Sequence, residues 1–164
     1  MTLPSLMVFL AVYYTLRQYH EQQTKMNLLS NRQINDKVIL PLKLQAYERL
    51  IMLCERISIA DLVLRLKAPG TSSSELKSAL LLALQQEFEH NLTQQLYVSE
   101  ELWQILLGMK ARTMDLIMQA SDGLSMNASA EEYAMKLITL ASGETNQPSR
   151  IGIKAIKTES SLWA

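Results

Sequence analysis

The sequence has little glycine and proline, a single cysteine and no excess of charge of either sign. Five glycines and four prolines among 164 residues leave few breaks for a β-rich fold with many turns. The one cysteine, Cys54, excludes an internal disulfide, and its apolar surroundings predict a buried, reduced thiol. Sixteen basic and sixteen acidic residues cancel, so we expect no general phosphate-binding surface and no nucleic acid as a partner.

Motifs for the common chemistries are also missing. The chain contains no P-loop, no Gly-x-Gly-x-x-Gly, no Cys-x-x-Cys, no His-Glu-x-x-His and no Gly-x-Ser-x-Gly elbow. We therefore expect that the protein is not an enzyme and has no catalytic residue and no cofactor. Hydrophobic residues make up 48% of the chain, and its length suffices to bury one core, so composition predicts a folded protein.

The first segment of the chain is apolar, since residues 1–16 read MTLPSLMVFLAVYYTL and contain no charge. Sixteen helical residues span about 24 Å, slightly less than a ~30 Å hydrocarbon core, and a snorkelling Arg17 extends the segment to residues 1–19. We expect residues 1–19 to form a transmembrane anchor. Two alternatives stay open: a core helix of the bundle, favoured by the shortness of the segment, and a signal peptide, disfavoured because no cation precedes it.

The cations around this segment predict its orientation. None precedes it, whereas Arg17, Lys25, Arg32 and Lys37 follow it. The positive-inside rule then predicts a single-pass inner-membrane protein whose C-terminal domain is cytoplasmic. The polar residues 20–40 are expected to form a helical stalk or connector between the anchor and that domain.

Beyond the connector, the apolar spacing predicts helices that begin after a break at Pro41. The expected helices cover residues 42–57, 58–67, 72–98, 99–123 and 129–141. Serines that suit N-cap positions open four of them, namely Ser58, Ser72, Ser99 and Ser129. We predict an all-α fold, a bundle of about five or six helices with its main domain over residues 41–145, followed by a short helix or flexible tail over residues 146–164.

The apolar positions of the three longest of these helices predict their buried faces. They are Ala46, Leu50, Leu53 and Ile57 in the first, Leu76, Leu80, Leu84, Phe88 and Leu92 in the second, and Trp103, Leu107, Met114, Ile117 and Met118 in the third.

Several polar residues fall on or beside these apolar faces and form a predicted structural cluster. They are Glu87, Asn91, Lys110, Arg49 and Arg56. A buried carboxylate needs a partner, so our hypothesis is that Glu87 pairs with one of the three cations. The alternative is that these cations extend to solvent. If the pair is buried, Glu87→Ala should destabilise the fold by about 3–5 kcal/mol.

Glu87 and His90 also form a Glu-x-x-His motif, which di-iron bundles use twice together with two further carboxylates. The chain has two histidines, His20 and His90, and no glutamate stands three residues before His20. One chain cannot supply the ligands of such a site, so we expect no metal and keep Glu87 and His90 as weak candidates. A metal- or ligand-binding site around Glu87, His90 and Asn91 stays the alternative interpretation.

Two segments resemble a known family. Residues 40–50 (LPLKLQAYERL) and residues 87–99 (EFEHNLTQQLYVS), together with the apolar N-terminus, resemble an uncharacterised family of small bacterial proteins with a domain of unknown function. The resemblance covers most of residues 1–142. It implies a membrane-proximal helical domain and no assigned activity, cofactor or catalytic residue.

Together these patterns favour a membrane-anchored cytoplasmic helical protein that acts as an interaction or scaffolding module. Its expected partners are the membrane, through residues 1–19, and a second copy of the chain or another protein. No small-molecule substrate can be identified from the sequence.

Overall fold

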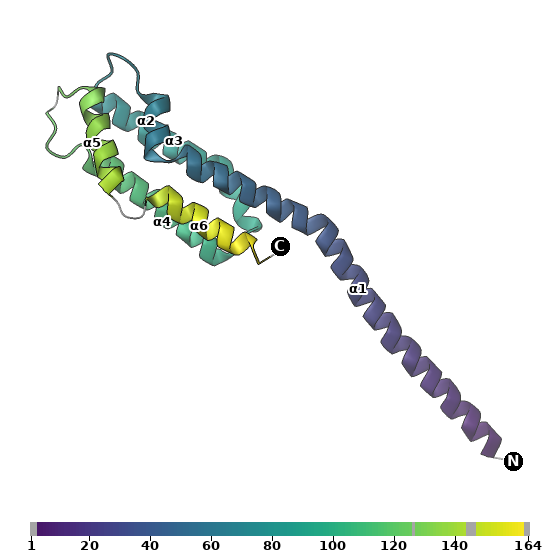
Figure 1. Cartoon of the computed structure of the whole chain (residues 1–164). Coiled ribbons are helices and arrows are strands. Elements are labelled where there is room, and N and C mark those ends of the chain that lie inside the picture. Colours follow the sequence, from purple (N-terminus) through teal and green to yellow (C-terminus); the bar gives the residue numbers. More distant parts are fainter. Residues whose placement is uncertain (1–2, 126, 144–146, 163–164) are drawn as a thin grey trace. The chain divides into compact units, whose positions relative to one another are not determined.

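The computed structural model consists of helices joined by short connections (Figure 1). It describes residues 3–125, 127–143 and 147–162, and in the first range it describes the side chains of residues 13–19, of residue 23 and from residue 37 onward. The elements are α1 (Leu3–Arg56), α2 (Ile59–Leu66), α3 (Ser73–Asn91), the 3-10 helix η1 (Leu92–Leu96), α4 (Glu100–Gln119), α5 (Ala130–Gly143) and α6 (Pro148–Ser160). No strand occurs within these ranges, so the all-α prediction is confirmed.

The predicted break at Pro41 is wrong, because α1 continues through this residue. A proline fixes φ near the helical value and costs one backbone hydrogen bond, so a long helix with good hydrogen bonding on both sides can contain it. The chain nevertheless divides next to this position into two compact units, Met1–Leu42 and Lys43–Ala164, which we describe separately.

The first unit is helical, and its described side chains from Tyr13 to Tyr19 are exposed. Tyr13 and Tyr14 make an edge-to-face contact, with ring centroids 6.2 Å apart. A helix with both the length and the apolar character to cross a membrane is not found among the described residues. Met1, Thr2 and the side chain of His20 lie outside the description.

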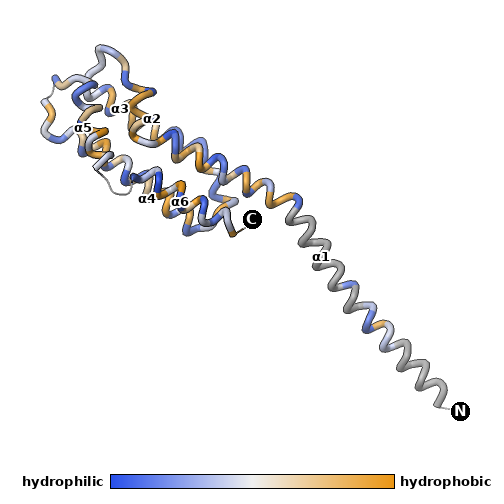
Figure 2. The backbone as a smooth tube through the Cα atoms, in the orientation of Figure 1, coloured by the Kyte–Doolittle hydropathy of each residue, from blue (hydrophilic) through white to orange (hydrophobic). Residues whose placement is uncertain are grey.

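The second unit has one hydrophobic core that all its α-helices share. Figure 2 shows apolar residues recurring along these helices. The face predicted for residues 42–57 is confirmed, since Ala46, Leu50, Leu53 and Ile57 are all buried. Cys54 is a buried free thiol, as expected.

The face of α4 is predicted only in part. Trp103 and Ile117 are buried, whereas Leu107, Met114 and Met118 are 37%, 40% and 48% exposed. The buried side instead carries Leu102, Leu106, Met109, Thr113 and Leu116. Because α4 is apolar over more than half of its circumference, periodicity alone cannot select the side that faces the core.

The helix predicted over residues 72–98 ends earlier, at Asn91, and continues as η1. The Asn91 side chain donates to the backbone carbonyl of Glu87 at 2.8 Å, and such local bonds compete with regular helix hydrogen bonding. Leu92, predicted to be buried, is 51% exposed as a result.

The predicted serine caps are found at the helix starts. Ser72 and Glu75 form a complete capping box, and Ser58, Ser99 and Ser129 each accept a hydrogen bond from the backbone three residues later. Ser72 and Ser129 also form an isolated antiparallel bridge, which joins the starts of α3 and α5.

The tail predicted as a short helix or flexible segment contains α6, which packs against α4. Gly152 and Ile156 of α6 are buried. The C-terminal helix therefore belongs to the bundle.

Candidate functional site

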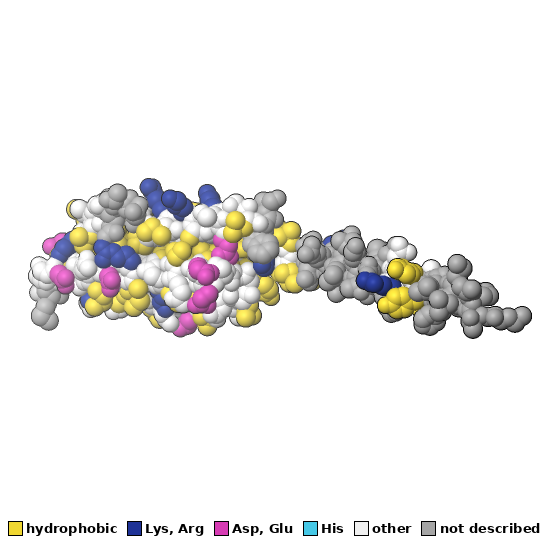
Figure 3. All heavy atoms as spheres, turned by 90° about the horizontal axis from the view of Figure 1, so that it is seen from below, with side chains coloured by type: hydrophobic (Ala, Val, Ile, Leu, Met, Phe, Trp, Pro, Cys, Tyr) yellow, Lys and Arg dark blue, Asp and Glu magenta, His cyan; other side chains and the backbone are white. Residues whose placement is uncertain are grey.

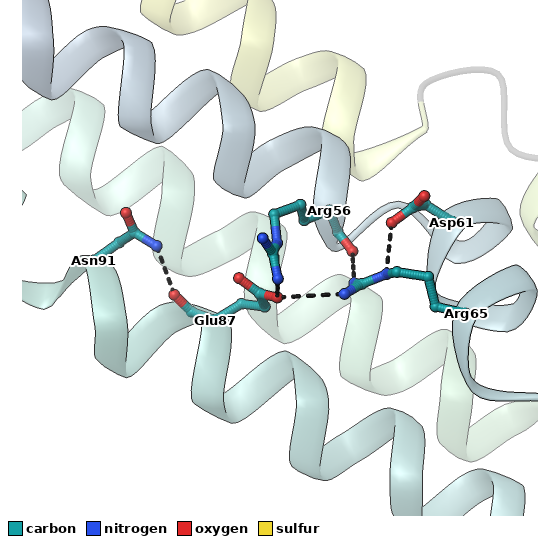
Figure 4. A network of polar contacts seen from close by, with 5 residues as sticks. All are labelled: Arg56, Asp61, Arg65, Glu87 and Asn91. Carbon is teal, nitrogen blue, oxygen red and sulfur yellow. Dashed lines mark hydrogen bonds and ion pairs between the residues drawn. The ribbon is translucent and has the colours of Figure 1, made fainter.

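The strongest polar cluster of the second unit lies where α1 ends and α2 and α3 meet (Figure 4). Its centre is Glu87, whose side chain is 12% exposed. The Arg56 Nε donates to Glu87 Oε1 at 2.8 Å, and Arg56 Nη2 lies 2.6 Å from the same oxygen. Of the three cations that the sequence offered as partners of Glu87, Arg56 is the one that contacts it.

Arg65 of α2 is a second partner of this carboxylate, with Nη1 3.5 Å from Glu87 Oε1. Its Nε lies 2.8 Å from Asp61 Oδ2, an i,i+4 pair within α2. Its Nη2 donates at 2.6 Å to the backbone carbonyl of Arg56, in the last turn of α1, where carbonyls lack helical partners. One guanidinium thus connects α1, α2 and α3.

Sequence reasoning missed Arg65. The spacing of Asp61 and Arg65 was the available signal, since it places opposite charges on one side of a short helix. The contact with the end of α1 had no sequence signal, because it depends on where the turn at Ser58 places α2 relative to the last turn of α1.

The other predicted members of the cluster have different roles. Lys110 donates to Gln85 Oε1 at 2.6 Å and lies 5.2 Å from the centre of the Phe88 ring, so it contacts α3 without reaching Glu87. Asn91 binds the backbone of Glu87. Arg49 is exposed.

The cluster shows no metal-binding geometry. Glu87 already accepts a hydrogen bond from Arg56 and forms an ion pair with Arg65, and His90 is exposed. Among the described residues, no three His, Cys, Asp or Glu side chains are grouped closely enough to hold a metal ion. Two arginines balance two carboxylates in this cluster, an arrangement that joins α1, α2 and α3.

A second polar contact joins distant parts of the chain and was not anticipated. Glu159 of α6 accepts from the Tyr47 hydroxyl of α1 at 3.0 Å and from the Ser99 backbone N–H at 3.0 Å. The Ser99 hydroxyl also donates to Glu159. The carboxylate therefore fixes the last turn of α6 to the start of α4, where the helix dipole favours negative charge.

A cavity of about 360 Å³ opens elsewhere in the bundle, between the start of α2 and the start of α6. Its walls include Ser58, Thr113, Ala141, Pro148 and Ile153, and exclude Glu87, His90 and Asn91. The polar cluster and this cavity are therefore separate features.

The sequence as a whole can now be compared with known proteins. The profile of one protein family matches residues 1–162. The chain belongs to DUF7935, a family of unknown function. Membership in DUF7935 confirms the resemblance seen in the two quoted segments, and leaves the bacterial origin and the membrane anchor as predictions. No curated protein and no solved structure is significantly similar to the chain.

Proposed function

We propose that this DUF7935 protein is held at the inner membrane by residues 1–19 and presents its helical bundle on the cytoplasmic side as an interaction or scaffolding module. The observation that supports this proposal most is the uncharged run of residues 1–16, which is followed by cations. The exposure of Tyr13, Tyr14, Leu16 and Tyr19, each more than half exposed, supports an interfacial role for this end of the segment.

The interaction part of the proposal is supported by an apolar stripe on the bundle. Leu107, Met114 and Met118 of α4 are spaced by seven and four residues, so they lie on one side of the helix, and all three are partly exposed. Exposed apolar side chains that share one side of a helix are typical of sites of protein contact. The guanidinium cluster at Glu87 stabilises the bundle that carries the stripe.

Fractionation of cells into membrane and soluble pools tests the anchor. The wild-type chain should enter the membrane pool, and Phe9→Lys should move it to the soluble pool, because a lysine near the middle of a span costs about 3 kcal/mol. Gln23→Lys adds the same charge in the polar connector and should leave the distribution unchanged. Recovery of the wild-type chain in the soluble pool without detergent would contradict the proposal.

Metal analysis separates this proposal from the alternative site at Glu87, His90 and Asn91. Stoichiometric iron, manganese or zinc in the purified chain would favour the alternative.

A further inference from the structure

The last helix, α6, has a cationic face. Arg150, Lys154 and Lys157 are all exposed, and their spacing by four and three residues places them in one stripe along the helix. The one acidic residue of α6, Glu159, lies outside this stripe and is occupied by Tyr47 and Ser99. The stripe therefore has no counter-charge on its own helix.

The described residues of the neighbouring elements form no ion pair with the stripe, although Glu55 of α1 and Arg150 line one cavity. Within the described part of the chain, none of its three side chains forms an ion pair or a hydrogen bond. In Figure 3, one group of lysine and arginine side chains lies along the upper edge of the bundle, while others lie lower in the view among the acidic side chains. Unpaired cations that are held in a row by a packed helix provide a preorganised surface for anions.

The same face is hollowed. A shallow groove of about 450 Å³ is lined by Arg150, Ile153, Lys154, Lys157, Thr158 and Ser161. Ile153 is the apolar residue of this lining, and Ile151, outside it, is 44% exposed. A row of cations without a counter-charge on its own helix is characteristic of surfaces that bind anionic lipid headgroups.

We propose that this basic stripe, formed by Arg150, Lys154 and Lys157, binds the anionic headgroups of the bilayer that anchors the chain, an inference that rests on the proposed function. Three cations are too few for tight binding of a free domain to nucleic acid, because affinity grows with the number of phosphates neutralised. A domain tethered to a bilayer experiences a much higher effective concentration of headgroups, at which three contacts suffice.

The test uses the full-length chain, reconstituted into vesicles of phosphatidylcholine alone or mixed with phosphatidylserine. A fluorophore on Ser161→Cys reports the approach of α6 to lipids that carry a quencher, while the native Cys54 is buried and stays unlabelled. The test variant combines Arg150→Gln, Lys154→Gln and Lys157→Gln. The matched control removes three other exposed cations through Arg49→Gln, Lys67→Gln and Arg112→Gln.

A cation near an anionic membrane strengthens binding about fivefold, so the test variant should weaken docking on phosphatidylserine vesicles about 100-fold. High salt should have a similar effect, and the control variant should dock as the wild type does. Equal loss in the test and control variants, or equal docking on both lipid mixtures, would overturn the proposal.

Two further readouts separate the possible failures. Flotation with phosphatidylcholine vesicles reports the anchor, so its loss contradicts the proposed function, whereas loss of the phosphatidylserine-dependent quenching contradicts only the basic stripe. If the wild type does not float, the tether is absent, and both the proposed function and the role of the basic stripe are contradicted. Retardation of duplex DNA by the wild type and not by the test variant would assign the stripe to nucleic acid and overturn the lipid assignment.

Discussion

Gly152 is the position at which one added methyl group tests the packing of α6 most sharply. A Cβ atom there would lie 2.6 Å from Met109 Sδ and 2.8 Å from Cys54 Sγ, well inside van der Waals contact. Both neighbours are buried in the core, so neither can turn into solvent to make room. The Gly152→Ala variant must therefore shift α6 away from α1 and α4 or displace core side chains.

The expected cost combines two opposing effects. Alanine is favoured over glycine in a helix by about 1 kcal/mol, whereas overpacking a core costs about 1–3 kcal/mol, and two close atoms place this site at the upper end. We expect a net destabilisation of about 2 kcal/mol, which lowers the Tm of a chain of this size by about 4–8 °C. Thermal and urea unfolding followed by circular dichroism measure both quantities.

Gly108 provides the matched control, since it lies within α4 and a Cβ there meets nothing within 4 Å. Gly108→Ala should stabilise the chain by up to about 1 kcal/mol, because only the helix preference changes. If Gly152→Ala proved as stable as Gly108→Ala, the close packing of α6 described above would be refuted.

Three further predictions concern polar groups of the bundle. Glu87→Ala should destabilise by about 1–2 kcal/mol in urea unfolding, less than expected for a buried pair, because Arg56 and Arg65 are 52% and 34% exposed and can regain water. Glu159→Ala should cost about 2 kcal/mol, since it leaves three donors without their acceptor. Burial raises the pKa of the Cys54 thiol to about 12, above the value of about 8.5 in the unfolded chain. The contribution of this thiol to the free energy of unfolding should therefore be fully present below about pH 8.5 and be lost as the pH rises towards 12. The folded thiol should also resist alkylation.

Each of these predictions has a control. Glu89→Ala removes an exposed carboxylate from α3 and should change stability by less than about 0.5 kcal/mol, so an equal effect of Glu87→Ala would argue against the cluster. Glu159→Gln keeps an acceptor oxygen and should recover part of the loss. In a Cys54→Ala variant the decline in stability between pH 8.5 and 12 should be reduced, and an unchanged decline would assign it to other groups.

The sequence predicts those features that depend on neighbours along the chain. Serine caps require a side chain and a backbone N–H three residues later, so Ser72 with Glu75 could be recognised before any fold was known. The buried face from Ala46 to Ile57 was predictable for the same reason, because the polar residues of that segment leave one apolar side.

Features that depend on tertiary contacts could not be predicted in this way. Apolar residues lie on several sides of α4, so its own sequence does not select the side that is buried. That side depends on where α6 packs, and α6 is distant in the sequence. Glu159 meets Tyr47 and Ser99 across separations of 112 and 60 residues, and no spacing rule connects such positions. The sequence offered three cations as partners of Glu87. Only the position of the end of α1 in the structure shows that Arg56 is the one that contacts it.

The most direct test of the central claim is the distribution of the full-length chain after extraction of the membrane pool with alkaline carbonate, which removes peripheral proteins. An anchor formed by residues 1–19 predicts that the wild-type chain stays in the membrane pellet and that Phe9→Lys is released. Release of the wild-type chain together with this variant would contradict the membrane-anchored function.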